Sequence, residues 1–149
     1  MDAIVYNKVE KEADRIIRAI QQSGGGGNFL TDLTLTENQK AVQIEIPDNA
    51  FTEYNNIGCL ILVSAESSAD WIYASFNTTT SNLYQGLSSQ LPLAYAVLLT
   101  KTATAWQIVL SNGNRQDINI NTSNYLYVQM YASNKFFGIG SKFILIGIN

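Results

Sequence analysis

Four consecutive glycines, Gly24 to Gly27, divide this 149-residue chain into two parts of different character. Eight of the first 22 residues are charged, and apolar residues recur there at spacings of three and four. After Gly27 the sequence is rich in Asn, Ser and Thr, and short apolar runs alternate with polar turns. A glycine run ends a helix and fixes no angle to the segment that follows. We therefore predict an N-terminal amphipathic helix over residues 1–22, a Gly-rich hinge over 23–28 and a β domain over 29–149.

The first segment carries an apolar stripe of coiled-coil type. Its members step by three, four, three and four residues, as the a and d positions of a heptad do. They are Tyr6, Val9, Ala13, Ile16 and Ile20. Val5 and Ile17 lie beside the stripe and widen it, so a bundle of three or more helices fits better than a dimer. An isolated helix of this length is marginal in water, so the stripe must pack against something. We expect self-association or insertion into a larger assembly; the alternative is that the helix folds back onto the open face of its own β domain.

Charge and hydropathy exclude several classes of partner. The net charge is −3, whereas a nucleic-acid partner would require a basic patch. From Ser23 onward only 13 of 127 residues are charged, less than half the usual share of about a quarter. The N-terminus is charged and has no apolar core of a signal peptide, and no apolar run approaches the ~18 residues of a membrane span. We therefore expect neither a signal peptide nor a nucleic-acid or membrane partner.

No catalytic constellation is found in the sequence. Histidine is absent, which removes the commonest general base and metal ligand. The acids Glu45 and Asp48 flank the end of a predicted strand, and Glu66 and Asp70 flank a predicted turn; both pairs are interpreted as solvated loop acids. The single cysteine, Cys59, lies within an apolar run and is interpreted as a buried thiol. We therefore expect a protein that is not an enzyme and has no cofactor or metal.

The second part of the chain predicts eight or nine short strands joined mostly by hairpins. Residues 57–64 are apolar on both faces, which indicates a central strand. Residues 48–56 are predicted as a loop, and residues 136–148 as one final strand with two apolar faces. Asn112-Gly113 lies between alternating strands and favours a type I′ hairpin. This pattern is typical of a mainly β protein, a jelly-roll-like antiparallel β-sandwich, with a barrel as the alternative.

Aromatic side chains are the only indication of a binding surface. Tyrosine offers apolar area together with a hydroxyl, which suits either a subunit interface or a platform for sugars. The candidates are Tyr125, Tyr127, Tyr131, Trp71, Tyr73 and Trp106. The first three share one face of a predicted strand, and for them we favour an interface over a ligand site. For each tryptophan we favour core packing.

The layout MDAIVYNKVEKEADRIIRAIQQSGGGG, followed by a charge-poor β domain that ends in FFGIGSKFILIGIN, resembles small virion structural proteins of tailed bacteriophages. These are head-fibre or tail-appendage subunits that join an N-terminal helical anchor to a β knob. The resemblance covers the whole chain. It implies a non-enzymatic homotrimer or decoration subunit, made in the host cytoplasm and carried on the virion.

The same resemblance implies partners. Tyr6, Val9, Ala13, Ile16 and Ile20 would form a threefold bundle, the helix would contact other virion proteins, and the β knob would meet the host surface, with a glycan as a candidate ligand. The alternative interpretation is a lectin-like carbohydrate-binding module whose helix mediates oligomerisation.

Overall fold

The computed structural model of this chain describes residues 15, 18, 27–64, 71–79, 83–86, 93–110 and 112–149. The helix predicted over 1–22, with its seam Tyr6, Val9, Ala13, Ile16 and Ile20, lies outside the described residues, except that the backbone of Arg15 and Arg18 is helical. The hinge prediction is wrong at its C-terminal end, because Gly27 and Asn28 already pair with Ile148 and Gly147 in a strand.

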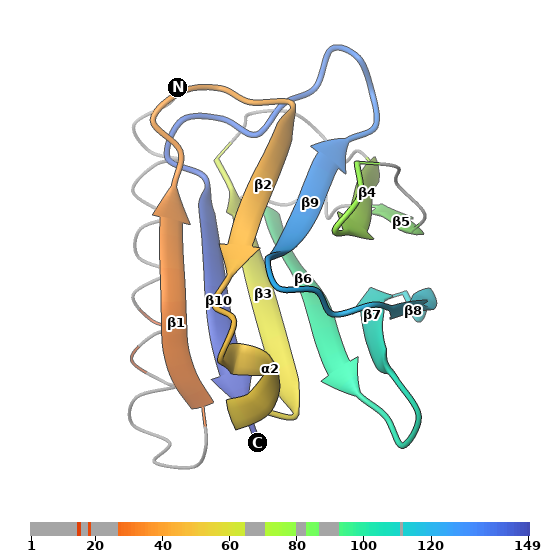
Figure 1. Cartoon of the computed structure of the whole chain (residues 1–149). Helices are drawn as coiled ribbons and strands as arrows, with labels where there is room; N and C mark the ends of the chain where they lie inside the picture. The colour runs from red at the N-terminus through yellow and green to blue at the C-terminus, as the bar shows by residue number, and fades with distance from the viewer. Residues whose placement is uncertain are drawn as a thin grey trace.

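Within the described ranges, the larger of two antiparallel sheets contains six strands in the order β1-β10-β3-β6-β7-β8. Its strands are β1 (Gly27–Thr34), β3 (Asn56–Val63), β6 (Leu93–Lys101), β7 (Trp106–Leu110), β8 (Arg115–Ile118) and β10 (Lys142–Ile148). In Figure 1 these strands follow one another from left to right in the order of the sheet. β3 lies between β10 and β6, so the prediction of a central strand over residues 57–64 is confirmed.

The smaller sheet contains four strands in the order β2-β9-β4-β5, and β2 and β9 lie in front of the larger sheet in Figure 1. Its strands are β2 (Ala41–Ile46), β4 (Trp71–Phe76), β5 (Leu83–Gly86) and β9 (Asn124–Met130). Along β2 and β9 buried residues alternate with more exposed ones. Leu126, Val128 and Met130 are fully buried, as their alternation predicts. The core of this mainly β, sandwich-like fold lies between the two sheets.

Strands that are far apart in the sequence pair in a nested order. The outermost pair is β1 with β10, followed by β2 with β9, β3 with β6 and β4 with β5. The first and third pairs belong to the larger sheet, and the second and fourth belong to the smaller one. The β7–β8 hairpin extends the larger sheet beyond β6.

A single-turn helix, α2 (Ala50–Glu53), occupies part of the segment 48–56, so the prediction of a loop there is wrong in part. Phe51 on this turn is buried and makes edge contacts with Phe76 of β4 and Trp106 of β7, with ring centroids 6.0 and 5.1 Å apart. The turn therefore carries an aromatic side chain between the two sheets.

The prediction of one strand over residues 136–148 is also wrong, because β10 begins only at Lys142. Gly140 has a φ of 87°, in the left-handed region that a strand cannot continue through. Its N–H donates to the carbonyl of Leu35 at 2.9 Å, which anchors the loop to the end of β1. Phe137 lies in this loop, where its side chain is fully buried and makes an edge contact with Phe143 of β10.

The hairpin between β7 and β8 forms, but its turn is not of type I′. Gly113 has a φ of 92°, and Asn112 is not among the residues with positive φ. The N–H of Gly113 donates to the carbonyl of Leu110 at 2.9 Å. A single left-handed glycine after a turn is typical of a G1 bulge, which replaces the two left-handed positions of type I′.

Candidate functional site

Five of the six aromatic candidates lie together on the outward side of the smaller sheet. We call them the aromatic face, which consists of Trp71, Tyr73, Tyr125, Tyr127 and Tyr131. β4 and β9 are paired, with Tyr73 opposite Gln129 and Ser75 opposite Tyr127. The residues between them in each strand are buried in the core, so these side chains project away from it. Tyr131 follows β9, and its N–H donates to the carbonyl of Trp71 at 2.8 Å.

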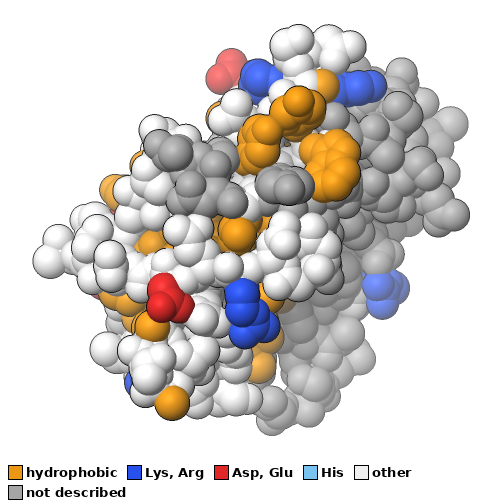
Figure 2. Space-filling model, turned by 90° about the vertical axis from the view of Figure 1, so that its right-hand side faces the viewer, with side chains coloured by type: hydrophobic (Ala, Val, Ile, Leu, Met, Phe, Trp, Pro, Cys, Tyr) orange, Lys and Arg blue, Asp and Glu red, His pale blue; other side chains and the backbone are white. Residues whose placement is uncertain are grey.

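One edge-to-face contact and one tilted contact order the rings of the aromatic face. The rings of Tyr73 and Tyr131 meet with centroids 5.4 Å apart at 78°, and those of Tyr125 and Tyr127 lie 6.3 Å apart at 43°. Tyr131 is 58% exposed and Trp71 is 47% exposed, more than any other large hydrophobic side chain among the described residues. Core packing, the interpretation favoured for Trp71, is therefore wrong. Figure 2 shows a group of hydrophobic side chains near the top of the molecule, with Lys or Arg side chains on either side of it.

Neutral amides, one carboxylate and one ammonium group border the aromatic face. The ammonium group is that of Lys40, which donates to the carbonyl of Ala132, next to Tyr131. Gln43 and Glu45 of β2 lie opposite Tyr127 and Tyr125 in the register, and Gln129 lies between Ala41 and Tyr73. Amides beside aromatic rings can donate and accept hydrogen bonds without a large cost of removing charge from water. The surface therefore suits a subunit contact or the hydroxyls of a sugar.

Trp106, the sixth candidate, is not part of this surface. It lies on β7 of the larger sheet, is partly buried and packs against the core, where its ring meets Phe51 at 85°. Core packing, the favoured interpretation of Trp106, agrees with this position.

A pocket that sequence reasoning missed opens where the end of β4 approaches the β7–β8 hairpin. Its volume is about 320 Å³. Its polar lining includes Ser75, Asn77, Thr78, Gln116, Asp117, Asn119 and Asn121. The signals in the sequence were the uncharged polar segments around Asn77 and Asn121, but their pairing across the sandwich is not visible in the sequence.

Asn77 organises the rim of this pocket. Its φ is 57°, a left-handed conformation that asparagine tolerates better than most residues. Its Oδ1 accepts the N–H of Tyr125 at 2.7 Å, and its Nδ2 donates to Oδ1 of the buried Asn124 at 3.0 Å and to the carbonyl of Asn119 at 3.2 Å. Asn124 in turn accepts the N–H of Asn121. This network ties the pocket rim to β9, the strand that carries Tyr125 and Tyr127.

Reactive and charged groups elsewhere in the described residues show no catalytic grouping. Cys59 is buried on β3, and burial raises the pKa of its thiol to about 12, so the thiolate that acts as a nucleophile is disfavoured. The described ranges contain no group of three His, Cys, Asp or Glu side chains placed to hold a metal ion. In the same ranges, no helix combines the length and the apolar character needed to cross a membrane.

Comparison of the chain with protein-family models, with curated proteins and with solved structures gives no match. Its function is therefore inferred from the fold, the aromatic face and the pocket.

Proposed function

We propose that this chain is a non-enzymatic virion structural protein, a homotrimeric head-fibre, tail-appendage or decoration subunit that assembles through its aromatic face. The observation that carries the proposal is the exposure of Trp71 and Tyr131 next to Tyr73 on the outward side of a sheet. Tyrosine and tryptophan dominate the energetics of protein interfaces, because each buries a large area at a low cost in side-chain entropy.

We infer a jelly-roll topology for the sandwich, and this topology would suit this class of protein. In a jelly roll, eight strands form two packed sheets linked by Greek-key connections. The nested pairs β1–β10, β2–β9, β3–β6 and β4–β5 supply eight strands that alternate pair by pair between the two sheets. The β7–β8 hairpin is then an addition to this frame. Viral capsid domains and lectin domains share the architecture, so the topology supports an assembly role or a sugar-binding role.

The distribution of charge supports assembly through the aromatic face. Glu45 is the acidic side chain that the register places beside Tyr125, and the remaining neighbours on β2 and β9 are Ala41 and the neutral Gln43 and Gln129. Interface cores are depleted in charged residues and enriched in Tyr and Trp. On a particle, three such domains around one axis would leave their other surfaces to meet the host.

The test is the oligomeric mass of variants of the full chain. Tyr131→Ser and Trp71→Ser remove exposed rings from the aromatic face, and Phe29→Ser is the matched control, because Phe29 is 40% exposed on β1 of the larger sheet. We expect the first two variants to lose the trimer in light scattering and the control to keep it. An unchanged mass in all variants would contradict assembly through the aromatic face.

A lectin-like carbohydrate-binding module is the second candidate, and the pocket at the β4 end favours it. Hydroxyl, amide and carboxylate groups, such as those of Ser75, Gln116 and Asp117, are the partners that sugar hydroxyls need. Glycan-array binding that is lost in Gln116→Ala and retained in Tyr131→Ser would establish this function. If the wild-type protein binds no glycan, the carbohydrate-binding function is excluded.

A further inference from the structure

Four apolar side chains on the outward side of the larger sheet form a cluster that is separate from the sandwich core. This outer cluster consists of Leu60, Leu62, Ile144 and Ile146. Leu62 and Ile144 are fully buried, although their neighbours Ile61 and Leu145 point to the core on the opposite side of the sheet. Side chains on the outward face of a sheet are inaccessible to water only when another element covers them.

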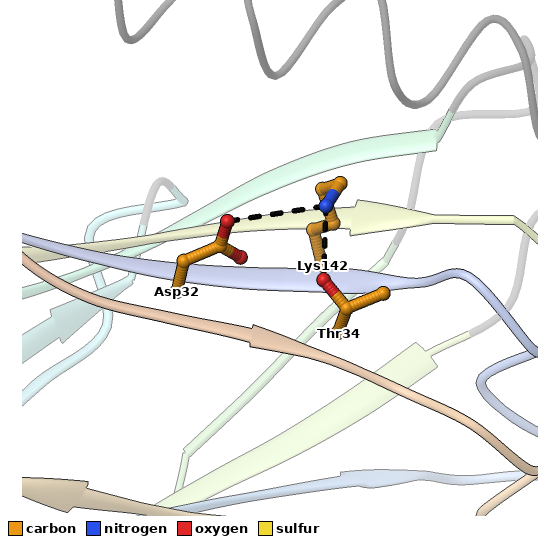
Figure 3. A network of polar contacts seen from close by, with 3 residues as sticks. All are labelled: Asp32, Thr34 and Lys142. Atoms are coloured by element: carbon orange, nitrogen blue, oxygen red, sulfur yellow. Dashed lines mark hydrogen bonds and ion pairs between the residues drawn. The ribbon is translucent and has the colours of Figure 1, made fainter.

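A buried ammonium group on the same face points to the same conclusion. Lys142 of β10 lies opposite Leu62 and is only 7% exposed. Its Nζ donates to Oγ1 of Thr34 at 2.9 Å and lies 3.9 Å from a carboxylate oxygen of Asp32 (Figure 3). A lysine on an outward face normally extends its ammonium group into water, and burying a charge is costly unless it is paired. The face around Lys142 is therefore covered, and groups on β1 compensate the buried charge.

The polar end of the same face limits the extent of the cover. Toward β8, Gln107 Nε2 donates to the carboxylate of Asp117 at 2.8 Å, and Arg115 donates to Gln107 Oε1 at 3.1 Å. These hydrogen bonds are exposed to solvent. The covered area therefore lies over β10 and β3, next to β1.

We propose that residues 1–22 of the same chain cover the outer cluster with their apolar stripe. The chain enters β1 at Gly27, which pairs with Ile148 at the end of β10, so the segment is attached at the edge of the cluster's own strands. The glycines Gly24 to Gly26 allow the chain to reverse direction there. The four stripe residues nearest this joint are Val9, Ala13, Ile16 and Ile20.

Length and polarity of the segment fit this position. A helix of about 20 residues spans about 30 Å, and a seven-residue strand such as β10 spans roughly 23 Å. The segment is therefore long enough to run along the whole of β10. Arg15 and Arg18 are helical and exposed, and they lie off the stripe, at the c and f positions of its heptad. An amphipathic helix docked by its apolar side presents such positions to water.

The inference does not rest on the proposed virion function. It assigns the stripe to a contact within the chain, in place of a bundle between subunits, and it leaves subunit contacts to the aromatic face. A monomeric wild type would contradict the proposed function and leave this inference standing.

Engineered disulfides in the full chain test the inference. In a Cys59→Ala background, Leu60→Cys is combined in turn with Val9→Cys, Ala13→Cys, Ile16→Cys and Ile20→Cys; the control combines it with Arg18→Cys. Leu60 is the partly exposed member of the outer cluster, so its replacement disturbs packing least. After mild oxidation at low protein concentration, we expect an intrachain disulfide for at least one stripe position and none for Arg18→Cys.

Two results of this experiment would overturn the inference. One is the absence of a disulfide at all four stripe positions. The other is a disulfide found only between chains on non-reducing gels, which would assign the cover to a second copy.

A stability measurement gives an independent readout. Ile16→Asp should lower the Tm of the β domain by several degrees and leave the oligomeric mass unchanged, because a carboxylate cannot be buried against Ile144 without a partner. Arg18→Asp should change neither quantity. A fall in mass with an unchanged Tm would place the stripe in a bundle between subunits and would overturn the inference.

Discussion

At the scale of single residues, Gly147 determines how closely Tyr54 packs against β10. A Cβ atom at position 147 would lie 2.5 Å from the ring of Tyr54, closer than carbon atoms can approach. Gly58 of β3 provides the contrast, because a Cβ there meets nothing within 4 Å. The two glycines thus have opposite tolerance for a methyl group, although both lie in central strands of the same sheet.

We therefore predict opposite effects of two alanine substitutions. Gly147→Ala should lower the free energy of unfolding by about 1–3 kcal/mol, because the ring of Tyr54 must move. Gly58→Ala should be neutral or should raise it by about 0.4–1 kcal/mol, because alanine restricts the unfolded chain. Urea denaturation of the two variants measures both effects. Equal destabilisation by both would contradict the close contact with Tyr54.

Cys59 gives a prediction about pH. Burial raises the pKa of its thiol from 9.0 to about 12, so the thiol stays protonated in the folded state while it ionises in the unfolded state above pH 9. The unfolded state then binds fewer protons, and stability must fall as pH rises from 9 toward 12. Ionisation of Cys59 in the unfolded state should increase the equilibrium constant of unfolding by up to about tenfold per pH unit.

The matched variant Cys59→Ala isolates this effect from the titration of lysines and tyrosines. Denaturation at pH 8, 9.5 and 10.5 should show the wild type losing its stability advantage over Cys59→Ala as pH rises. A constant difference between the two proteins would mean that the thiol is not buried in the folded state.

At the scale of elements, the segment after β4 depends on one asparagine. Asn77 combines a left-handed backbone with three side-chain hydrogen bonds, two to the start of β9 and one to the carbonyl of Asn119 after β8. We predict that Asn77→Gly lowers the free energy of unfolding by about 1–3 kcal/mol through the loss of these hydrogen bonds. Asn77→Ala should lower the free energy of unfolding by about 1 kcal/mol more than glycine does, because a Cβ atom disfavours the left-handed backbone conformation. If thermal denaturation finds alanine as stable as glycine at this position, the backbone is not held in the left-handed conformation.

The elements also show what the sequence could predict. Alternation predicted that Tyr125 and Tyr127 share one face of a strand, as they do on β9, because side chains in a strand point alternately to opposite faces. The final strand was predicted too long because Phe137 is apolar and buried, although it lies in a loop before the strand. The hydrogen bond from the N–H of Gly140 to the carbonyl of Leu35 holds that loop in place. Asn-Gly predicted the position of a hairpin correctly but not its turn type. In each error, tertiary contacts overrode a local signal.

At the scale of the whole molecule, the pairing of distant strands was beyond local patterns. Alternation in β9 indicated which of its faces carried tyrosines, but the meeting of Tyr131 with Tyr73 depends on the pairing of β9 with β4. The polar pocket likewise depends on how β4 approaches the β7–β8 hairpin. Periodicity predicts the face that a residue occupies, whereas the partner across the sheet is set by topology.

The fold leaves two surfaces with different roles in this account. The larger sheet buries an outer cluster under a cover, and the smaller sheet exposes its aromatic face. Exposed apolar rings that lie together on a flat surface are typical of sites where proteins associate. Assembly through the aromatic face is therefore the property on which the proposed function depends.

The mass of the wild-type chain in solution, measured by light scattering over a range of concentrations, tests this property most directly. We predict three times the monomer mass, with dissociation only on dilution. A monomer at every concentration would contradict assembly through the aromatic face and would leave the polar pocket, and with it the carbohydrate-binding module, as the better account.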